Sequence, residues 1–552
     1  MKAKLFGALL STLVLVASST TSYAAGPSPW RSSVGFTNVV ASTPVAGGGY
    51  PVRPGATAPE PGTCGPQTLN SNHSESWLAV KPGTEDLVGS SKFFIGKWST
   101  FYDFHLGSYT IRDGTPVSNN QVQGYECTTV GTQDMPPSWT NNTDPNVDFD
   151  TQGRVYQVTL PFNAFWANLH PDGAIDLSFS DDMGQHWVRG NGGQPLEHSP
   201  NASSFQFGHV EDKQWVAVNH IVGNRNQDHV YALWSVFNGL TTKVKIAVSR
   251  DRGLSFSKAV TVTAPSQTGP SNTFVYPAID AGGDVYVAFA SFPRPSIFTR
   301  ATIFVTRSTD DGVTWGPFVA VATAGIIPGC CLPNTTFRDG ILENFAASRT
   351  FPGHLYGTWE DWDGMQMDVK FAQSIDGGAT WSAPILVNDN VDMAASTDQF
   401  QPSVAAGPNG AVAVAFYDRR ARCPSDPSVL PADVGRTNFC INTTLQAFKD
   451  SGSGAVPVGP NVRISEFTWD PLNPAQHVDG IGQMACAGHS DPCTRRAFIG
   501  DYFGLAISRG NIYALFVSTH YPSSVGADEG GRVYYQQQVL AKVPRSEFGA
   551  GY

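Results

Sequence analysis

The sequence predicts an all-β protein built from repeated antiparallel units, and three observations support this fold class. The 552 residues include 56 glycines and 39 prolines, a share above the usual ~12%, which favours short strands and turns over long helices. Only 15% of the residues are charged and 41% are hydrophobic, which argues against a disordered chain or a coiled coil. Two different sequence patterns also recur along the chain.

The N-terminal segment is typical of an export signal. Two lysines near the start precede an apolar run from Leu5 to Ala17, and small residues end the segment at Ala24. We therefore expect residues 1–24 to be a signal peptide and the protein to be secreted or periplasmic. No apolar run reaches the ~20 residues that cross a bilayer, so we expect no membrane span.

The eight cysteines agree with export, because an even number in an exported chain indicates disulfides. Their connectivity cannot be read from sequence, and Cys330 and Cys331 stand side by side. No C-x-x-C spacing occurs, so a thiolate zinc site is not expected. Close spacing favours loops closed by Cys423 with Cys440 and by Cys486 with Cys493, and a bond between Cys64 and Cys127 could fix the N-terminal region.

Four segments share the form S-x-D-x-G-x-x-W/F. They begin at Ser180, Ser249, Ser308 and Ser374, which are 69, 59 and 66 residues apart. In such a segment the Ser and Asp side chains bond nearby backbone amides, and the glycine takes a corner with positive φ. Each copy lies between strand-like segments, so we predict a hairpin turn at each. Four copies at a near-constant period indicate a repeat architecture.

These segments resemble the Asp-box, the bacterial neuraminidase repeat of the sialidase superfamily, and the resemblance extends loosely over residues 70–540. It implies a β-propeller whose boxes lie on the outer turns of the blades, away from the active site. The resemblance therefore implies a structural role for the box carboxylates, which are Asp182, Asp251, Asp310 and Asp376.

A second repeat predicts the number of blades. Each copy is a strand, a turn that often contains Gly or Asn, and a second strand; the near-continuous apolar runs fit strands that are packed on both faces. We predict a seven-bladed propeller of four-stranded antiparallel blades, with the six blades of sialidases as the alternative. The seven copies begin at Trp77, Val147, Trp215, Tyr276, Phe345, Pro402 and Phe503.

Three regions follow the signal peptide in the predicted domain organisation. Residues 25–70 are rich in Pro and Gly and are expected to form a covering arm. Residues 71–545 are expected to form one propeller domain. Within it, residues 421–495 are expected to be a Cys-containing loop insertion.

Charge and missing motifs exclude several classes of function. The chain has 35 basic and 46 acidic residues, a net charge of −11 without basic runs, which argues against a nucleic-acid partner. No G-x-S-x-G, H-E-x-x-H or phosphate-binding loop occurs. Residues Asp148–Gly153 lack the third acid and final Glu of a calcium loop, so we predict a turn there and no metal or other cofactor, with structural calcium as the less favoured alternative.

One face of the predicted propeller collects the charged residues that are scarce elsewhere. In propellers the first strand of each blade starts, and the second strand ends, at the same face around the axis, where loops carry function on a rigid scaffold. The residues that this geometry places there include Glu75, Lys213, Asp339, Asp398, Arg419 and Asp501.

The resemblance implies a sialidase-type site at this face. Three arginines would bind the sugar carboxylate, a tyrosine beside a glutamate base would be the nucleophile, and an aspartate would be the general acid. The Arg-Ile-Pro sequence that sialidases carry ahead of the first box does not occur here. The candidates by position are Arg338, Arg420 and Arg496 for the anion, Tyr502 or Tyr417 as nucleophile, Glu343 or Glu360 as base, and Asp212 or Asp418 as acid.

The resulting prediction is a secreted exo-α-sialidase-like glycoside hydrolase that acts on an anionic glycan. One alternative is a non-catalytic Asp-box propeller that binds glycans or proteins. A further alternative is a polysaccharide lyase, for which His520 and Tyr521 would contact the substrate and move a proton. Structural interpretations also stand: Asp418–Arg420 could be an ion-pair cluster that clamps adjacent blades, and Tyr502 a buried residue at a strand entry.

Overall fold

The computed structural model of the chain describes most of the residues between 28 and 552, in segments. The described residues are 28–42, 45–46, 69–94, 104–121, 141–162, 173–199, 209–238, 241–293, 299–328, 331–333, 335, 337, 339–340, 343–390, 397–422, 440–469, 471, 498–521, 523–524 and 535–552. The predicted signal peptide lies outside them. No helix in these segments is long and apolar enough to cross a membrane.

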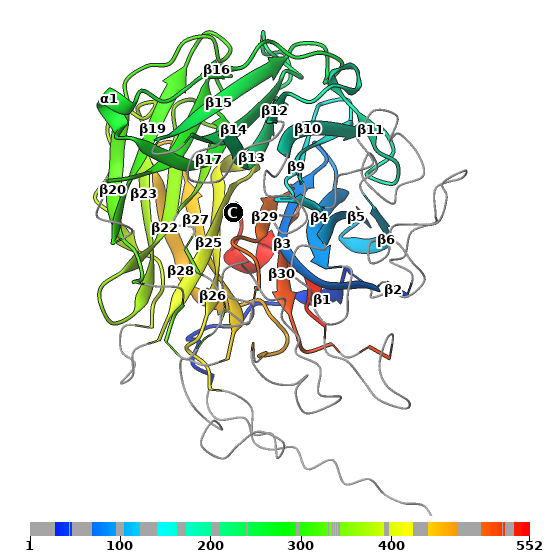
Figure 1. Cartoon of the computed structure of the whole chain (residues 1–552). Coiled ribbons are helices and arrows are strands. Elements are labelled where there is room, and N and C mark those ends of the chain that lie inside the picture. Colours follow the sequence, from blue (N-terminus) through cyan, green and yellow to red (C-terminus); the bar gives the residue numbers. More distant parts are fainter. Residues whose placement is uncertain are drawn as a thin grey trace, which may run out of the picture.

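The described chain is almost entirely β-structure, arranged as antiparallel sheets that follow one another around a common centre (Figure 1). Six sheets form in the described chain, and the largest divides into two antiparallel halves whose strands are paired by a single parallel bridge, Thr242 with Ser271. The chain thus contains seven consecutive groups of strands, which we call units 1 to 7. Helical turns are short: α1 (Pro265–Thr268), η2 (Asn191–Gly193), η3 (Pro408–Gly410) and η4 (Arg545–Phe548).

The first strand of each unit lies nearest the centre (Figure 1), and neighbouring first strands contact one another in chain order. The first strand of unit 7 also contacts the first strand of unit 1. These strands are β3 (Leu69–Val80), β8 (Asp148–Phe149), β13 (His209–Val218), β17 (Ser271–Ile279), β21 (Glu343–Ala347), β25 (Gln399–Ala406) and β29 (Gly504–Ile507).

Each first strand pairs with a second strand that returns antiparallel to it, as the second sequence repeat predicts. The apolar runs of the second strands are buried on both faces; in one of them, Val285–Phe292, every residue is buried. The second strands are β4 (Leu87–Phe94), β9 (Val155–Phe162), β14 (Val230–Asn238), β18 (Val285–Phe292), β22 (Leu355–Trp362), β26 (Ala411–Asp418) and β30 (Asn511–Ser518).

The third and fourth strands form the outer part of the units. The third strands are β5 (Phe104–Arg112), β10 (Gly173–Ser180), β15 (Thr241–Ser249), β19 (Arg300–Ser308), β23 (Met367–Ser374), β27 (Asn442–Asp450) and β31 (Gln537–Pro544). The fourth are β6 (Thr115–Gln121), β11 (Val188–Arg189), β16 (Val260–Thr261), β20 (Val319–Gly325), β24 (Ile385–Leu386), β28 (Ala455–Arg463) and β1 (Thr37–Val40). Short strands β2 (Val45–Ala46), β7 (Asn141–Thr143) and β12 (Glu197–Ser199) extend units 1 and 2.

The four Asp-box segments connect the third strand to the fourth in units 2 to 5. In the second box, Ser249 Oγ donates to Asp251 Oδ1 (2.8 Å) and accepts from Gly253 N (2.8 Å), while Ser255 N donates to Asp251 Oδ1 (2.9 Å). The same bonds recur around Asp182, Asp310 and Asp376. Because third strands end at the face opposite to the first-strand starts, the boxes lie on that opposite face.

Residues 37–40 do not merely cover the domain, as was expected for the arm 25–70. They form β1, which pairs antiparallel with β31 from Thr37 opposite Lys542 to Val40 opposite Val539. The N-terminal segment therefore supplies the fourth strand of unit 7. Half of its side chains are exposed, as a strand at a sheet edge allows.

The predicted loop insertion 421–495 is also corrected by the structure. Residues 442–450 and 455–463 are β27 and β28, the outer strands of unit 6. β28 was not predicted because it contains prolines and glycines, which are typical of loops. An edge strand such as β28 tolerates these residues, whereas a central strand does not. Of the predicted disulfide partners the structure describes Cys440, which is not free; the partners proposed for it and for the other pairs lie outside the described residues.

Units 7 and 1 meet through close backbone contact and hydrogen bonds. A Cβ added to Gly504 would lie 2.7 Å from Leu78 N and 2.8 Å from the Trp77 Cα, so this position requires glycine. Ser76 Oγ donates to Leu515 O (2.6 Å), and Tyr513 Oη donates to Glu85 Oε2 (2.8 Å). The last unit is thereby joined to the first.

Candidate functional site

The starts of the first strands share a local arrangement. A residue with positive φ stands two positions before an anchoring side chain: Glu75 (48°), Lys213 (53°), Phe274 (56°) and Gly500 (101°). Asp144 (56°) and Gln401 (46°) occupy the same position in units 2 and 6. The register of β3, β13, β17 and β25 shifts at these points. Such bulges and left-handed residues cost energy and redirect side chains, and they are concentrated at functional sites.

The anchoring side chains form an aromatic layer at the centre. Trp215 contacts Trp77 and Tyr276, each at 4.7 Å between ring centroids, and Tyr502 at 5.1 Å. Trp77, Trp215, Tyr276 and Tyr502 come from units 1, 3, 4 and 7, and Phe345 of unit 5 belongs to the same packed cluster. We call these five residues the aromatic layer. Side chains from segments distant in sequence therefore meet on one axis.

Charged residues form a second layer on the strand-start side of the aromatic layer. Lys213 Nζ lies 3.0 Å from Asp501 Oδ2 and 3.4 Å from Asp144 Oδ2. Lys92 Nζ lies 2.5 Å from Glu75 Oε2. Residues of five different segments thus converge here. We call these residues and their charged neighbours the axial charged layer. Its members are Glu75, Lys92, Asp144, Lys213, Asp339, Glu343, Glu360, Asp398, Arg419 and Asp501.

Three carboxyl groups of this layer hold their protons strongly. Burial and the neighbouring carboxylate of Asp398 raise the pKa of Asp339 to about 8. Burial, followed by the charge of Asp339, raises the pKa of Glu360 well above its usual value. Burial also raises the pKa of Glu343 well above its usual value. Glu360 is positioned by Gln401, whose backbone N–H donates to Glu360 Oε2 (3.0 Å).

The carboxyl group of Asp144 is ionised because cations lie beside it, whereas burial raises the pKa of Glu75 to about 7 although Lys92 lies beside that group. Burial raises the pKa of Asp144, but the charges of Lys213 and Lys92 more than offset it, so the pKa lies below its usual value. Burial lowers the pKa of Lys213, but Asp144 and Asp501 raise it well above its usual value. The layer therefore combines protonated carboxylic acids with carboxylates that are ion-paired to lysine.

Arg419, rather than Arg420, belongs to the axial charged layer. Its Nη1 donates to Asp398 Oδ2 (3.1 Å) and to the carbonyl of Pro333 (2.7 Å), and its charge affects the pKa of Asp339. Asp398 Oδ1 also accepts from Met367 N (3.0 Å). The arginine is fully buried and holds the carboxylate of Asp398 in place.

Arg420 and Asp418 form a separate buried ion-pair cluster. Arg420 Nε donates to Asp418 Oδ2 (2.6 Å), Nη1 to Asp389 Oδ1 (2.5 Å) and Nη2 to Asn461 Oδ1 (2.9 Å). Every guanidinium nitrogen is thus engaged, and no fork remains for a substrate carboxylate. The cluster ties the segment before unit 6 to its outer strand, which is a structural role.

The two tyrosines predicted as nucleophiles are buried anchors. Tyr502 Oη donates to the Pro145 carbonyl (3.0 Å), and burial, followed by the charges of Asp144 and Glu75, raises its pKa well above its usual value. Tyr417 Oη accepts from Val517 N (3.0 Å), and burial raises the pKa of Tyr417 as well. A nucleophilic tyrosine needs a lowered pKa or an adjacent base. These contacts agree with the alternative interpretation of Tyr502 as a buried residue at a strand entry, and a nucleophilic role for either tyrosine stays a prediction.

The remaining predicted residues lie at other places. Asp212 is half-buried, beside Lys213, and its Oδ1 accepts from Lys213 N (2.8 Å). His520 stacks on Phe467 at 3.8 Å and packs edge-on against Tyr521, and burial lowers the pKa of His520. Burial raises the pKa of Tyr521 to about 12. Arg338 and Arg496 lie outside the described residues.

Sequence reasoning missed several members of the site. Asp144 stands two positions before the anchoring residue of unit 2, as Glu75 and Lys213 do in theirs, so the repeat itself contained this signal. Lys92 is a lysine within a buried second strand, which is a rare placement that indicates a buried partner. Within the described segments, no group of three or more His, Cys, Asp or Glu residues is arranged to hold a metal ion.

Comparison with known proteins gives only distant likenesses. No protein-family model matches the chain, and no curated protein is similar to it. The Hadza microbial sialidase Hz136 is 13% identical, with a TM-score of 0.38 over 83% of this chain and 76% of that one. The intramolecular trans-sialidase from Ruminococcus gnavus is 14% identical, with a TM-score of 0.38 over 87% and 96%.

A third solved structure is the GH93 α-L-arabinofuranosidase of Fusarium graminearum. It is 15% identical, with a TM-score of 0.32 over 61% of this chain and 93% of that one. Likenesses of this degree do not establish a shared fold or activity.

Proposed function

We propose that the protein is a secreted glycoside hydrolase whose acid and base are carboxyl groups of the axial charged layer. The observation that carries this proposal is the divergence of pKa values within one layer. Glu360 keeps its proton, Asp144 beside Lys213 and Lys92 does not, and the negative charge of Asp501 raises the pKa of Lys213 together with that of Asp144. Pairs of carboxyl groups with diverging pKa values are what glycoside hydrolysis requires.

In this proposal Glu360 is the general acid that protonates the leaving oxygen. Asp501, ion-paired to Lys213, is the ionised carboxylate that acts on the other side of the sugar ring. Asp212 and Lys213 are half-buried, and we propose that the sugar approaches beside them. The aromatic layer beneath gives the charged layer a rigid support.

The substrate we propose is a neutral glycoside. Each cation in the described part of the layer is already ion-paired to a carboxyl group of the layer, so none is left to bind a sugar carboxylate. An anionic glycan, as a sialidase would bind, stays a prediction that rests on Arg338 and Arg496. Arg420 does not contribute to it, because its nitrogens are engaged elsewhere.

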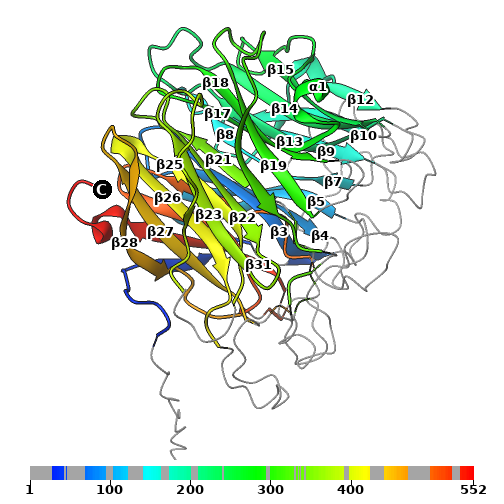
Figure 2. The same ribbon diagram turned by 90° about the vertical axis from the view of Figure 1, so that its left-hand side faces the viewer.

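We propose further that the seven units are the blades of one seven-bladed β-propeller. The successive contacts of the first strands, and the return of β29 to β3, support a closed ring. Figure 2, turned by 90° from Figure 1, shows the sheets from the side. Secretion rests on the sequence of residues 1–24 alone.

The test is a hydrolysis assay on the purified mature chain with neutral aryl glycosides and a fluorogenic sialoside. We expect turnover of a neutral glycoside, and a 10²- to 10⁴-fold loss of kcat in Glu360→Gln, which is what removing a general acid costs. Because Glu360 is already uncharged, the variant should unfold at the same temperature as the parent. Glu466→Gln, at an exposed glutamate, is the matched control.

Two outcomes would reject the proposal. Turnover that Glu360→Gln leaves unchanged would remove this residue from the mechanism. Retention on a glycan array without product from any glycoside would favour the non-catalytic propeller. Turnover of the sialoside alone would restore the anionic sugar as the substrate.

A further inference from the structure

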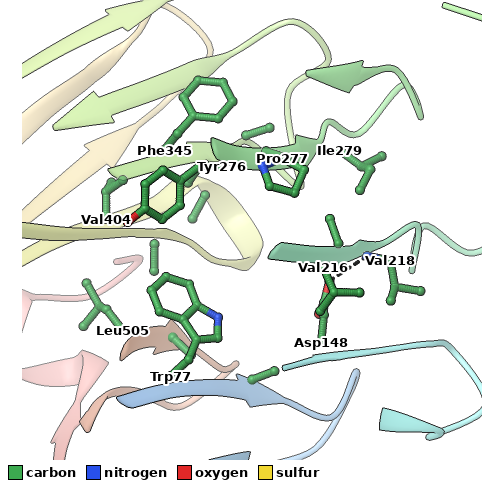
Figure 3. Close-up of a pocket in the computed structure, with 18 of the residues that line it drawn as sticks. Trp77, Asp148, Val216, Val218, Tyr276, Pro277, Ile279, Phe345, Val404 and Leu505 are labelled. Atoms are coloured by element: carbon green, nitrogen blue, oxygen red, sulfur yellow. Dashed lines mark hydrogen bonds between the residues drawn. The ribbon is translucent and has the colours of Figure 1, made fainter. Parts of the chain in front are cut away.

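A second site lies on the same axis, on the other side of the aromatic layer. There the carboxyl-terminal halves of six first strands, with Val147 and Asp148 of unit 2, surround a cavity of about 130 Å³ (Figure 3). At roughly 10–15 Å³ for one water, this cavity has room for about ten water molecules. It opens toward the face of the Asp-boxes, because first strands end at that face.

Most of the side chains that line the cavity are apolar, while backbone groups and three polar side chains also contribute to its surface. Trp77, Trp215, Tyr276 and Phe345 of the aromatic layer line it on one side, and Ala, Val, Leu and Ile of the first strands line the rest. Figure 3 shows Trp77 and Tyr276 on opposite sides of the space. Apolar and aromatic side chains with a few polar groups among them are typical of sites for small organic molecules.

Two of the polar groups in the wall are already engaged. Asp148 Oδ2 accepts from Val218 N (2.8 Å; Figure 3), and Asp148 Oδ1 accepts from Phe149 N (2.9 Å). His220 Nδ1 lies 3.3 Å from the Phe149 carbonyl. Burial, followed by the charge of Arg349, lowers the pKa of His220 well below its usual value, so this ring is uncharged.

The third polar group is Arg349, which follows β21 and whose side chain is exposed at the cavity. Among the described residues Arg349 makes no hydrogen bond and no ion pair within 4 Å. A guanidinium carries five N–H donors in a planar fork that matches a carboxylate. Among the described residues of the wall this fork is the one permanently charged cation, and its N–H groups make no hydrogen bond, although the charge of Arg349 also acts on Asp148 and lowers the pKa of that carboxyl group.

We infer that the axial cavity is a binding site for a small organic anion, whose carboxylate pairs with Arg349 and whose apolar body lies against Trp77, Tyr276 and Phe345. A bare inorganic ion would leave the apolar wall unused. A cation would meet only the carboxylate of Asp148, which two backbone N–H groups already bind. A monocarboxylate with a flat apolar body uses both parts of the site.

This site does not depend on the proposed hydrolysis. The aromatic layer separates the cavity from the axial charged layer, so a ligand in the cavity does not touch Glu360 or Asp501. An inactive Glu360→Gln protein should therefore still bind the anion. Failure of one proposal can be told from failure of the other.

The experiment is calorimetric titration of the full mature chain with benzoate and with its neutral counterpart benzamide. We expect benzoate to bind, and benzamide to bind at least tenfold more weakly. Arg349→Gln should weaken benzoate at least tenfold and leave benzamide unchanged. Arg509→Gln, at an exposed arginine on a hairpin tip, is the matched control and should bind as the parent does.

A second variant tests the cavity itself. Ala278→Leu narrows the wall without changing charge, and should abolish binding of both probes. The inference is overturned if the parent does not bind benzoate at millimolar concentration, or if Arg349→Gln binds it as tightly as the parent. Equal binding by inorganic phosphate would overturn the role given to the apolar wall.

Discussion

Asp339 should make the protein less stable as the pH rises, and its replacement by asparagine should remove this effect. The folded protein holds the Asp339 proton up to a pKa of about 8, whereas the usual value is 3.8. Above pH 4 the unfolded chain releases this proton and the folded chain does not. A raised folded pKa thus contributes stability at low pH that is lost as the pH rises toward 8.

The magnitude follows from 1.36 kcal/mol for each pKa unit. Between pH 5 and pH 8 the free energy of unfolding should fall by about 3 to 4 kcal/mol through Asp339 alone. In Asp339→Asn the side chain is neutral at every pH, so this contribution disappears. The variant should therefore gain stability relative to the parent as the pH increases.

The assay is urea unfolding at pH 5, 6, 7 and 8, followed by tryptophan fluorescence, for the parent and for Asp339→Asn. Asp113→Asn, at an exposed aspartate, is the matched control and should follow the parent at every pH. Parallel curves for the parent and Asp339→Asn would show that Asp339 titrates normally. The reasoning about a protonated axial layer would then be refuted.

Two further predictions concern stability. Arg420→Ala should lower the free energy of unfolding by about 3–5 kcal/mol, because Asp418 would be left buried without its arginine and the partly exposed Asp389 would also lose its ion pair; a loss under 1 kcal/mol in urea unfolding would contradict the structural role given to Arg420. Trp215→Ala should cost about 3–5 kcal/mol, because Trp215 contacts three rings of the aromatic layer; an unchanged melting temperature would show that the layer does not stabilise the centre.

The repeats made the strand pairs predictable. The Ser, Asp and Gly of each box make bonds within a few residues, so their local sequence fixes the turn. The apolar runs of the first and second strands are equally local signals. For the same reason the sequence located the strand starts at which Glu75, Lys213, Asp339 and Asp501 gather.

The orientation of single side chains at that face was not predictable. Arg419 and Arg420 are neighbours at the end of β26, and neighbouring side chains of a strand point to opposite sides. The axial partner is Arg419, bound to Asp398, while Arg420 turns to Asp389 and Asn461. Only the fold decides which of the two faces the centre, because a shift of one residue would exchange them.

For Tyr502 the sequence left two interpretations open, a nucleophile or a buried residue at a strand entry. Tyr502 occupies the position that Trp77 and Trp215 occupy in other units, so the repeat pattern itself indicates an anchor. A nucleophilic role would require the hydroxyl group of Tyr502 to be free to attack a substrate. The hydroxyl instead donates to Pro145, a contact across 357 residues of chain that no local pattern contains.

The pairing of β1 with β31 has a consequence for how the chain acquires its structure. Thr37 meets Lys542, so the last sheet cannot be completed until the final segment of the chain has been synthesised. Closing a loop of some 500 residues costs roughly 5 kcal/mol in chain entropy. This cost is smaller if the intervening sheets form first, because they shorten the flexible loop that must be closed. β1 is synthesised early but stays unpaired until β31 has been made. A polypeptide truncated before residue 537 would lack β31, so the edge of its last sheet would be open to pairing with other chains.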